Sequence, residues 1–171
     1  MKKITLVFLF IVLSALSVSA QPETLQDPLL EHMIGKWILQ GTMAGRETTH
    51  DIDVEWILGH RYVQLHEVAR EKKASGEAAY EATVFLGWDP PSSQYACLWL
   101  DVTGIGGLSA QAIGHAPKST DKMAFLFKYD CGIFHTTFVY DEHTDTWQWL
   151  MDEEEKGKLQ PFARVKMTRR G

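Results

Sequence analysis

The chain reads Asp-Ile-Asp-Val-Glu-Trp-Ile-Leu across residues 51–58. Apolar side chains recur at every second position, at Ile52, Val54, Trp56 and Leu58, and acidic residues occupy most of the positions between them. A period of two places successive side chains on opposite faces of an extended strand. The stretch therefore predicts a β-strand with one face in a core and the other face in water.

The same alternation recurs in ten segments along the chain, separated by turns rich in Gly, Pro, Asp and Ser. Short, even connections favour an up-and-down meander, and closure of the sheet removes its exposed edges. We predict an all-β fold, a single antiparallel up-and-down β-barrel of about ten strands; a two-sheet sandwich is the alternative. The predicted strands cover residues 36–43, 51–58, 61–70, 80–88, 94–101, 108–114, 122–129, 133–140, 146–151 and 161–168.

A short N-terminal helix precedes the first strand. Asp27 suits the helix N-cap, Pro28 suits the first helical position, and Gly35 suits the residue just past the end. The apolar residues between them are too few for a helix that is stable alone. We therefore expect this helix to lie across one end of the barrel.

Residues 1–20 have the layout of a secretory signal peptide. Two lysines open the chain, an apolar run spans Leu6 to Leu16, and small residues precede a cut after Ala20. The run is shorter than the roughly 20 residues that cross a bilayer, although an uncleaved anchor is the alternative. We predict export to the periplasm or the medium, with residues 21–171 as one lipocalin-like domain.

The charge of the chain argues against two classes of partner. Removing residues 1–20 takes away two lysines and no acidic residue, so the formal charge of −5 becomes −7. An acidic domain lacks the positive surface that nucleic acids require. No second long apolar run follows, so we expect no membrane span in the mature chain.

The ends of the predicted barrel carry a specific pair of residues. Gly35 and Trp37 form a Gly-x-Trp at the start of the first strand, and Arg169 follows the last. If the barrel closes, the arginine can stack on the tryptophan. In these residues the chain resembles the calycin superfamily, which includes lipocalins, fatty-acid-binding proteins and nitrobindin-like barrels. The resemblance implies a structural role for Gly35, Trp37 and Arg169.

Further short motifs are similar to those of a bacterial family of exported lipocalin-like domains of unknown function. That resemblance implies a barrel over nearly the whole mature chain, and it implies little about function. The residues that carry it are Leu29-Leu30, Gly35-Lys36-Trp37, Gly59 to Val63, Leu86 to Asp89, Tyr95, Trp99, Asp101 and Gly114.

Aromatic residues on the repeating strand phases suggest a lumen that holds a small apolar or amphipathic molecule. Ordinary core packing explains any single one of them, and the cluster is more suggestive than its members. A barrel filled by its own side chains, acting through its surface or as a structural module, is the alternative function. The candidate ligand-binding aromatic residues are Trp56, Trp88, Trp99, Phe127 and Trp149.

His66 and His135 lie in the middle of predicted strands and complete the candidate ligand-binding set. Either could orient a ligand, coordinate haem iron or act as acid/base in an enzyme. Nitrobindin-like barrels place their axial histidine near the C-terminal end, and the strand at 161–168 contains no histidine. We therefore expect no haem or other cofactor, and no catalytic residue is assigned.

Two acidic loops are considered as metal sites and neither is assigned as one, although the loop of Asp141, Glu142, His143 and Asp145 has a slightly better case for a weak site than residues 152–155. Residues 152–155 are consecutive acids without the spaced oxygen ligands and glycine of a calcium loop, so they predict a solvated hairpin tip. Cys97 and Cys131 could form a disulfide in an exported protein. The alternative is one buried and one partly exposed free thiol.

Overall fold

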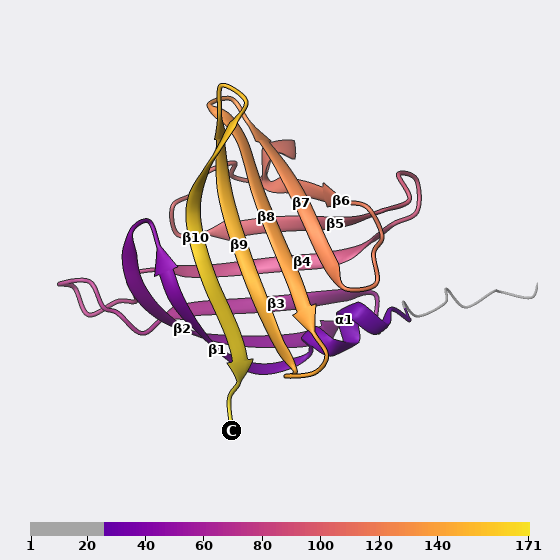
Figure 1. Cartoon of the computed structure of the whole chain (residues 1–171), viewed down its shortest axis with the longest axis horizontal. Helices are drawn as coiled ribbons and strands as arrows, with labels where there is room; N and C mark the ends of the chain where they lie inside the picture. Colours follow the sequence, from indigo (N-terminus) through magenta and orange to yellow (C-terminus); the bar gives the residue numbers. More distant parts are fainter. Residues whose placement is uncertain (1–25) are drawn as a thin grey trace, which may run out of the picture.

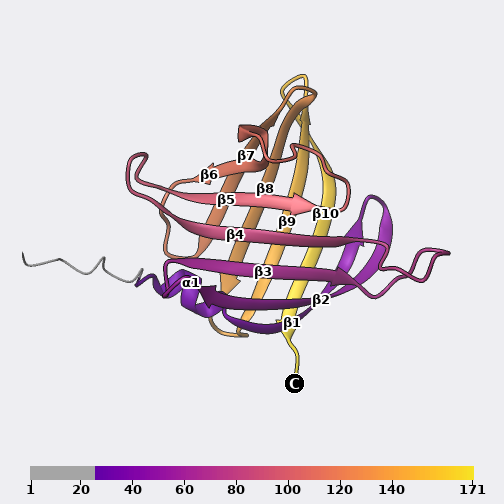
Figure 2. The same ribbon diagram turned by 180° about the vertical axis from the view of Figure 1, so that it is seen from behind.

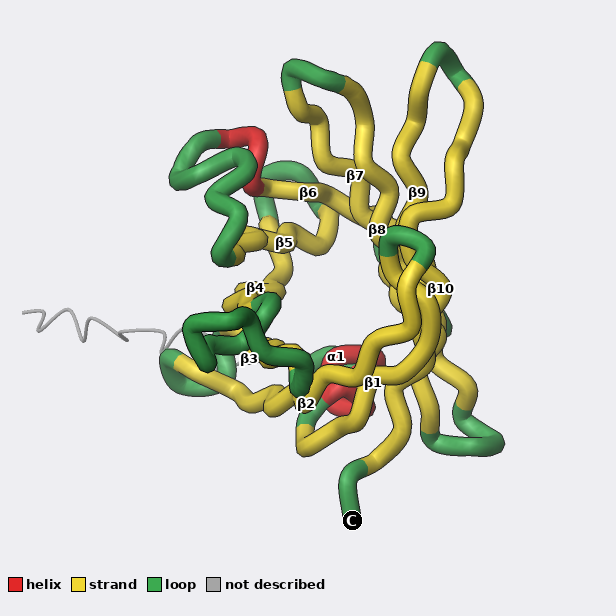
Figure 3. Tube along the Cα trace, turned by 90° about the vertical axis from the view of Figure 1, so that its left-hand side faces the viewer, coloured by secondary structure: helices red, strands yellow, loops and turns green. Residues whose placement is uncertain are grey.

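A computed structural model describes residues 26–171, and its ten strands form one closed antiparallel barrel (Figures 1 and 2). Each strand pairs with the next along the chain, and β10 pairs with β1, which closes the ring (Figure 3). The prediction of an all-β, up-and-down barrel is confirmed, and closure excludes the two-sheet sandwich. The signal peptide predicted at residues 1–20 lies outside the described residues. The elements are α1 (Pro28–Met33), β1 (Gly35–Met43), β2 (Arg46–Ile57), β3 (Tyr62–Ala69), β4 (Glu81–Asp89), β5 (Gln94–Asp101), the 3₁₀ helix η1 (Ala110–Ala112), β6 (Ile113–Ala116), β7 (Lys122–Tyr129), β8 (Gly132–Asp141), β9 (Thr146–Glu155) and β10 (Lys158–Arg169).

Helix α1 covers one end of the barrel, as the sequence predicts. The side chain of Asp27 caps the helix by accepting from two backbone N–H groups, at 3.0 and 3.2 Å. It also accepts from the Tyr95 hydroxyl of β5 at 2.6 Å. On other strands, Trp37 Nε1 donates to the Met33 carbonyl at 2.8 Å and Trp56 Nε1 donates to Glu31 at 3.1 Å. These bonds tie the helix to three strands.

Burial along the strands follows the two-residue period. In β3, for example, Val63 and Leu65 are fully buried, while Gln64 and His66 between them are partly exposed. The interior of the barrel contains large side chains that pack against one another and against α1. The largest fully buried ones are Trp37, Trp147, Trp149, Tyr95, Phe125, Phe127, Phe138, Leu30 and Met33.

Arg169 links the last strand, β10, to the first strand, β1, and to α1. Its guanidinium lies 3.8 Å from the centre of the Trp37 ring and donates to the carbonyls of Ile34 at 2.6 Å and His32 at 3.1 Å. Gly35 has φ +131°, and a Cβ there would lie 2.5 Å from Arg169 Nη1. Only glycine leaves room for this contact, so the predicted pairing of the Gly-x-Trp with the arginine is confirmed.

Several strand boundaries differ from the prediction. β2 begins at Arg46 rather than at residue 51, because a tight turn at Ala44 and Gly45 lets it pair with β1 from its first residue. The strand predicted over residues 108–114 is instead η1 followed by the short β6. The Ser109 hydroxyl accepts from the backbone of Gln111 and caps the 3₁₀ turn, which competes with extended structure.

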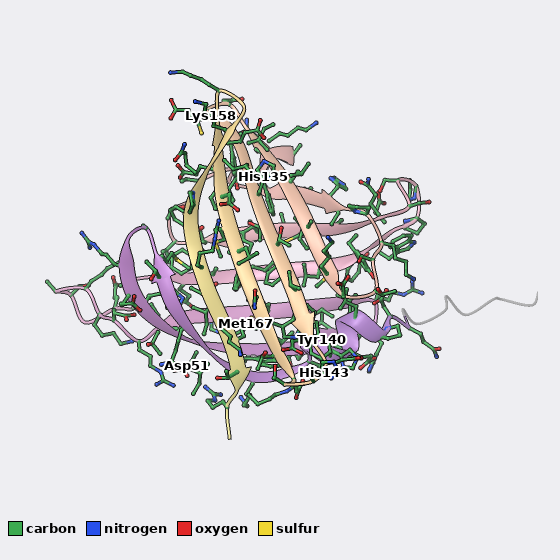
Figure 4. All side chains as sticks on the ribbon, in the orientation of Figure 1. Asp51, His135, Tyr140, His143, Lys158 and Met167 are labelled. Carbon is green, nitrogen blue, oxygen red and sulfur yellow. The ribbon has the colours of Figure 1, made fainter. Side chains whose placement is uncertain are left out.

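The acidic stretch after Met151 is strand rather than turn. β9 continues to Glu155 and pairs with β10 from Lys158, so only Lys156 and Gly157 form the tip of this hairpin. The hairpin rises beyond the rest of the barrel, with Lys158 at its end (Figure 4). Consecutive charged residues are tolerated there because the hairpin projects away from the core.

The two cysteines are both free thiols. Cys97 is fully buried on β5, and burial raises the pKa of its thiol well above the usual range. Cys131 is exposed in the turn between β7 and β8. The structure therefore favours the second alternative, a buried thiol and an exposed one.

Replacing Arg169 with alanine should destabilise the barrel, because it removes the stacking on Trp37, the bonds to the carbonyls of His32 and Ile34, and the ion pair with Asp145. We expect the free energy of unfolding to fall by about 2 kcal/mol. Urea denaturation would measure this loss. Arg170→Ala is the control, since among the described residues the Arg170 side chain pairs with Asp51 and Asp53 alone, on the surface, and its loss should cost under about 1 kcal/mol. Equal losses in both variants would contradict a role for Arg169 in closure.

The exposures of the two thiols predict their reactivity. A maleimide should modify Cys131 within minutes and leave Cys97 unmodified until the barrel unfolds. Mass spectrometry of the native and the urea-unfolded protein would count one and two modified thiols, respectively. Modification of Cys97 in the native protein would contradict its burial.

Candidate functional site

The end of the barrel opposite α1, which we call the mouth, carries a polar cluster on its inner face. The strands reach this end at the turns after β1, β3, β5, β7 and β9 (Figure 1). We define the mouth cluster by its five residues, which come from four successive parts of the chain. They are His50 of β2, Glu67 of β3, Tyr80 before β4, and Trp99 and Asp101 of β5.

His50 and Glu67 form a buried pair within the mouth cluster. Their side chains are 2% and 0% exposed, and His50 Nδ1 contacts Glu67 Oε1. His50 Nε2 lies 2.7 Å from the Thr48 hydroxyl, so both ring nitrogens are held by neighbouring side chains. Glu67 Oε2 is also buried, and it has no hydrogen-bond partner among residues 26–171. A buried polar atom of this kind costs free energy unless something bonds to it.

Tyr80 links this pair to the other half of the mouth cluster. Its hydroxyl donates to Asp101 at 3.1 Å and accepts from Trp99 Nε1 at 3.2 Å. Its ring is stacked with the ring of His50, with 5.8 Å between centroids. Burial, and then the charge of Glu67, raise the pKa of Tyr80 far above the ordinary value. The phenol therefore stays neutral and serves as a fixed donor and acceptor.

Aromatic rings form the floor of the mouth, and Trp99 belongs both to this floor and to the mouth cluster. Trp99 lies 5.4 Å from Trp149 and 6.4 Å from Phe127, measured between ring centroids, and Phe138 lies 4.4 Å from Trp149. Trp149 Nε1 is buried and donates to no group within the described part of the chain. Among the described residues, the mouth cluster and its floor thus contain one buried acceptor, Glu67 Oε2, and one buried donor, Trp149 Nε1, that have no hydrogen-bond partner. Both lie in residues that contact aromatic rings or the cluster around them. Such a combination can hold a small molecule with an apolar body and a polar group.

The structure brings together three of the predicted ligand-binding residues and separates the others. Trp99, Phe127 and Trp149 form the floor of the mouth. Trp56 and Trp88 lie at the opposite end, where Trp56 bonds to α1 and Trp88 packs edge-on against Tyr95. A ligand held at the mouth therefore contacts the first group and not the second.

The two predicted histidines lie on the outer wall of the barrel. His66 Nε2 contacts Glu81 at 2.9 Å and His135 Nε2 contacts Glu154 at 2.8 Å, and these side chains are part-exposed or exposed. His135 is marked on the upper part of β8 in Figure 4. Both residues alternate with buried neighbours such as Leu65 and Thr136. They are therefore not part of the mouth cluster.

Sequence reasoning missed His50, Glu67, Tyr80 and Asp101. The signal for Glu67 is present, because it shares the apolar phase of Val63 and Leu65 in the predicted strand. A charged residue at such a position must face the core. His50 gave no such signal, because the predicted strand began one residue after it.

A concave region lies outside the barrel, beside α1. It has a volume of about 330 Å³ and is lined by residues of α1, of the turn before β7 and of the turn after β8. His32 stacks on Tyr140 there, with 4.3 Å between ring centroids; Tyr140 and His143 are marked at this end in Figure 4. No buried side-chain atom without a partner is found among its described lining residues. The mouth is therefore the stronger candidate site.

Two further properties of the described residues bear on function. Within residues 26–171, no three His, Cys, Asp or Glu side chains are arranged to share a metal ion. In the same range, no helix has the length and apolar character needed to cross a bilayer.

Comparisons with known proteins add no relative. No protein-family model matches the chain, and no curated protein matches it. The structure establishes a closed ten-stranded barrel, which is compatible with a calycin-like fold.

The coupling of His50 and Glu67 predicts the outcome of removing either one. Glu67→Leu or His50→Leu alone should lower the free energy of unfolding by about 3–5 kcal/mol, because each leaves a polar partner buried without its mate. The double variant should lose less than either single variant. Urea denaturation of the four proteins would measure this cycle.

The outer pair of His66 and Glu81 provides the matched control. It is exposed, so His66→Leu and Glu81→Leu should each change stability by under about 1 kcal/mol. Additive losses at His50 and Glu67 would show that the inner pair is not coupled.

Proposed function

We propose that this chain is an exported, calycin-like barrel that binds a small apolar or amphipathic molecule at the mouth. The observation that carries the proposal is Glu67, which is fully buried and has an oxygen without a partner among the described residues. A protein retains such a group at a cost in stability. Ligand binding explains the cost, because a bound polar group can satisfy the oxygen.

The contents of the barrel support entry from the mouth. Helix α1 covers the other end, where Trp37, Trp147 and the helix's own Met33 are fully buried. At the mouth, by contrast, Tyr80 and Trp99 are only partly buried. A ligand would therefore lie with its polar group near Glu67 and its apolar part against Trp99.

Export and family membership enter this proposal from the sequence. Residues 1–20 have the pattern of a signal peptide, and the contact between Trp37 and Arg169 matches the pairing expected from the calycin resemblance. A periplasmic or secreted binding protein is consistent with both features. Purification from the periplasm or medium of an expressing bacterium, with an N-terminus at Gln21, would support export.

A barrel that holds no ligand is the second candidate. The many large side chains in the core favour it, because they occupy much of the interior. The protein would then act through its outer surface or as a structural module. A direct binding measurement separates the two candidates.

Trp99 should contribute strongly to binding. We expect the neutral fluorescent probe N-phenyl-1-naphthylamine to bind the wild-type protein, and Trp99→Ala to weaken its affinity by about tenfold through loss of aromatic contact. Fluorescence titration would measure both dissociation constants. Native mass spectrometry of protein purified without denaturation would show any ligand that co-purifies.

Trp88→Ala is the matched control for Trp99→Ala. Trp88 is also a partly buried tryptophan, but it lies at the end covered by α1. Its replacement should leave probe affinity unchanged in protein that retains its circular dichroism spectrum. Absence of any probe binding to the wild-type protein would overturn the proposal in favour of the ligand-free barrel.

A further inference from the structure

The chemistry of Glu67 limits the ligand groups that can satisfy it. An ionised carboxylate only accepts hydrogen bonds, so Oε2 requires a donor. The neighbouring His50 already contacts the other oxygen and is held on its far side by Thr48. Any donor to Oε2 would therefore come from outside the described residues, and a charged donor would form the stronger bond.

The charges around the mouth cluster favour a positive ligand group. Three carboxylates lie in or beside the cluster: Glu67, Asp101 and Glu71, whose oxygens accept from Thr48 and from the backbone of Thr49. None of these carboxylates has a Lys or Arg nitrogen within 4.0 Å among residues 26–171. His50 can supply one compensating charge, and Arg70, which lies near Glu71, is itself paired with Asp51.

The aromatic surfaces of the mouth add a second attraction of the same sign. The ring faces of tryptophan and tyrosine carry negative electrostatic potential and attract cations that lie over them. The aromatic side chains of the mouth form a continuous series of contacts that starts at His50. The ring of Tyr80 stacks on His50, the Tyr80 hydroxyl bonds to Trp99, and the ring of Trp99 lies beside that of Trp149 in the floor. A desolvated cation at this position gains from both the carboxylate and the rings.

We infer that the mouth cluster selects organic amines in their ammonium form, with the ammonium group donating to Glu67 and the apolar part lying against Trp99 and Trp149. This inference rests on the proposed binding at the mouth. It names the ligand class by charge and hydrogen bonding, and it is independent of whether the protein is exported.

A series of probes with the same chain length tests the class directly. n-Octylamine, n-octanol and octanoate differ only in the terminal group, and at neutral pH they are a cation, a neutral molecule and an anion. Each would be titrated against wild-type protein by isothermal calorimetry or by displacement of N-phenyl-1-naphthylamine. We expect octylamine to bind about tenfold more tightly than octanol, and octanoate to bind most weakly.

Glu67→Gln identifies the residue responsible. The substitution keeps the size of the side chain and removes its charge, so octylamine affinity should fall about tenfold while octanol affinity changes by less than about twofold. Glu81→Gln is the control, because Glu81 also pairs with a histidine but lies on the outer wall. It should leave all three affinities unchanged.

The outcomes separate the ligand class from the proposed function. If octanol or octanoate binds the wild-type protein as tightly as octylamine, the ammonium class is wrong and binding at the mouth stands. An unchanged octylamine affinity in folded Glu67→Gln also overturns the class. If neither the naphthylamine probe nor any of the three octyl compounds binds, the proposed function itself fails. Because the probe series uses the wild-type protein, the test does not depend on the variant folding.

Discussion

Closure of the sheet between β1 and β10 is the constraint on which the rest of the structure depends. The two strands pair over seven residues on each side, and the guanidinium of Arg169 stacks on Trp37 where that pairing ends. Gly41 permits the close approach, because a Cβ there would lie 2.3 Å from the Arg164 carbonyl. An open sheet would leave two edges unpaired. Closure removes both edges and directs one phase of every strand to a shared interior.

The closed barrel has a densely packed apolar half near α1 and a more polar half at the mouth. Near α1 the interior is packed with aromatic and aliphatic side chains, and the helix bonds to three strands through Asp27, Glu31 and Met33. At the mouth the same inner face carries a histidine, two carboxylates and a phenol. Burying these polar groups is unfavourable. The packed half of the barrel allows the chain to tolerate that cost at the other end.

The histidines show how far sequence reasoning reaches for the site. His66 and His135 were predicted as ligand-binding because they lie mid-strand, yet both alternate with buried residues and face outward. His50 lies inside, although it was assigned to no strand. Among the aromatic residues, Trp99, Phe127 and Trp149 meet at the mouth, whereas Trp56 and Trp88 share their inward phase and lie at the other end. The sequence pattern shows which side chains share an inward-facing phase of a strand. It does not show at which end of the barrel each of them lies.

The sequence by itself determined the fold class, the approximate strand count and the capped helix. These follow from local rules, since period, turn residues and caps act over a few positions. The contact of Gly35 and Trp37 with Arg169 was expected from the resemblance, and it forms because β10 closes on β1. Only the tertiary structure decided that His50, Glu67, Tyr80 and Asp101 meet. Their contacts depend on the register of β2 against β3 and of β4 against β5, which a closed ring sets globally. Register depends on the packing of the whole interior, so no local pattern encodes it.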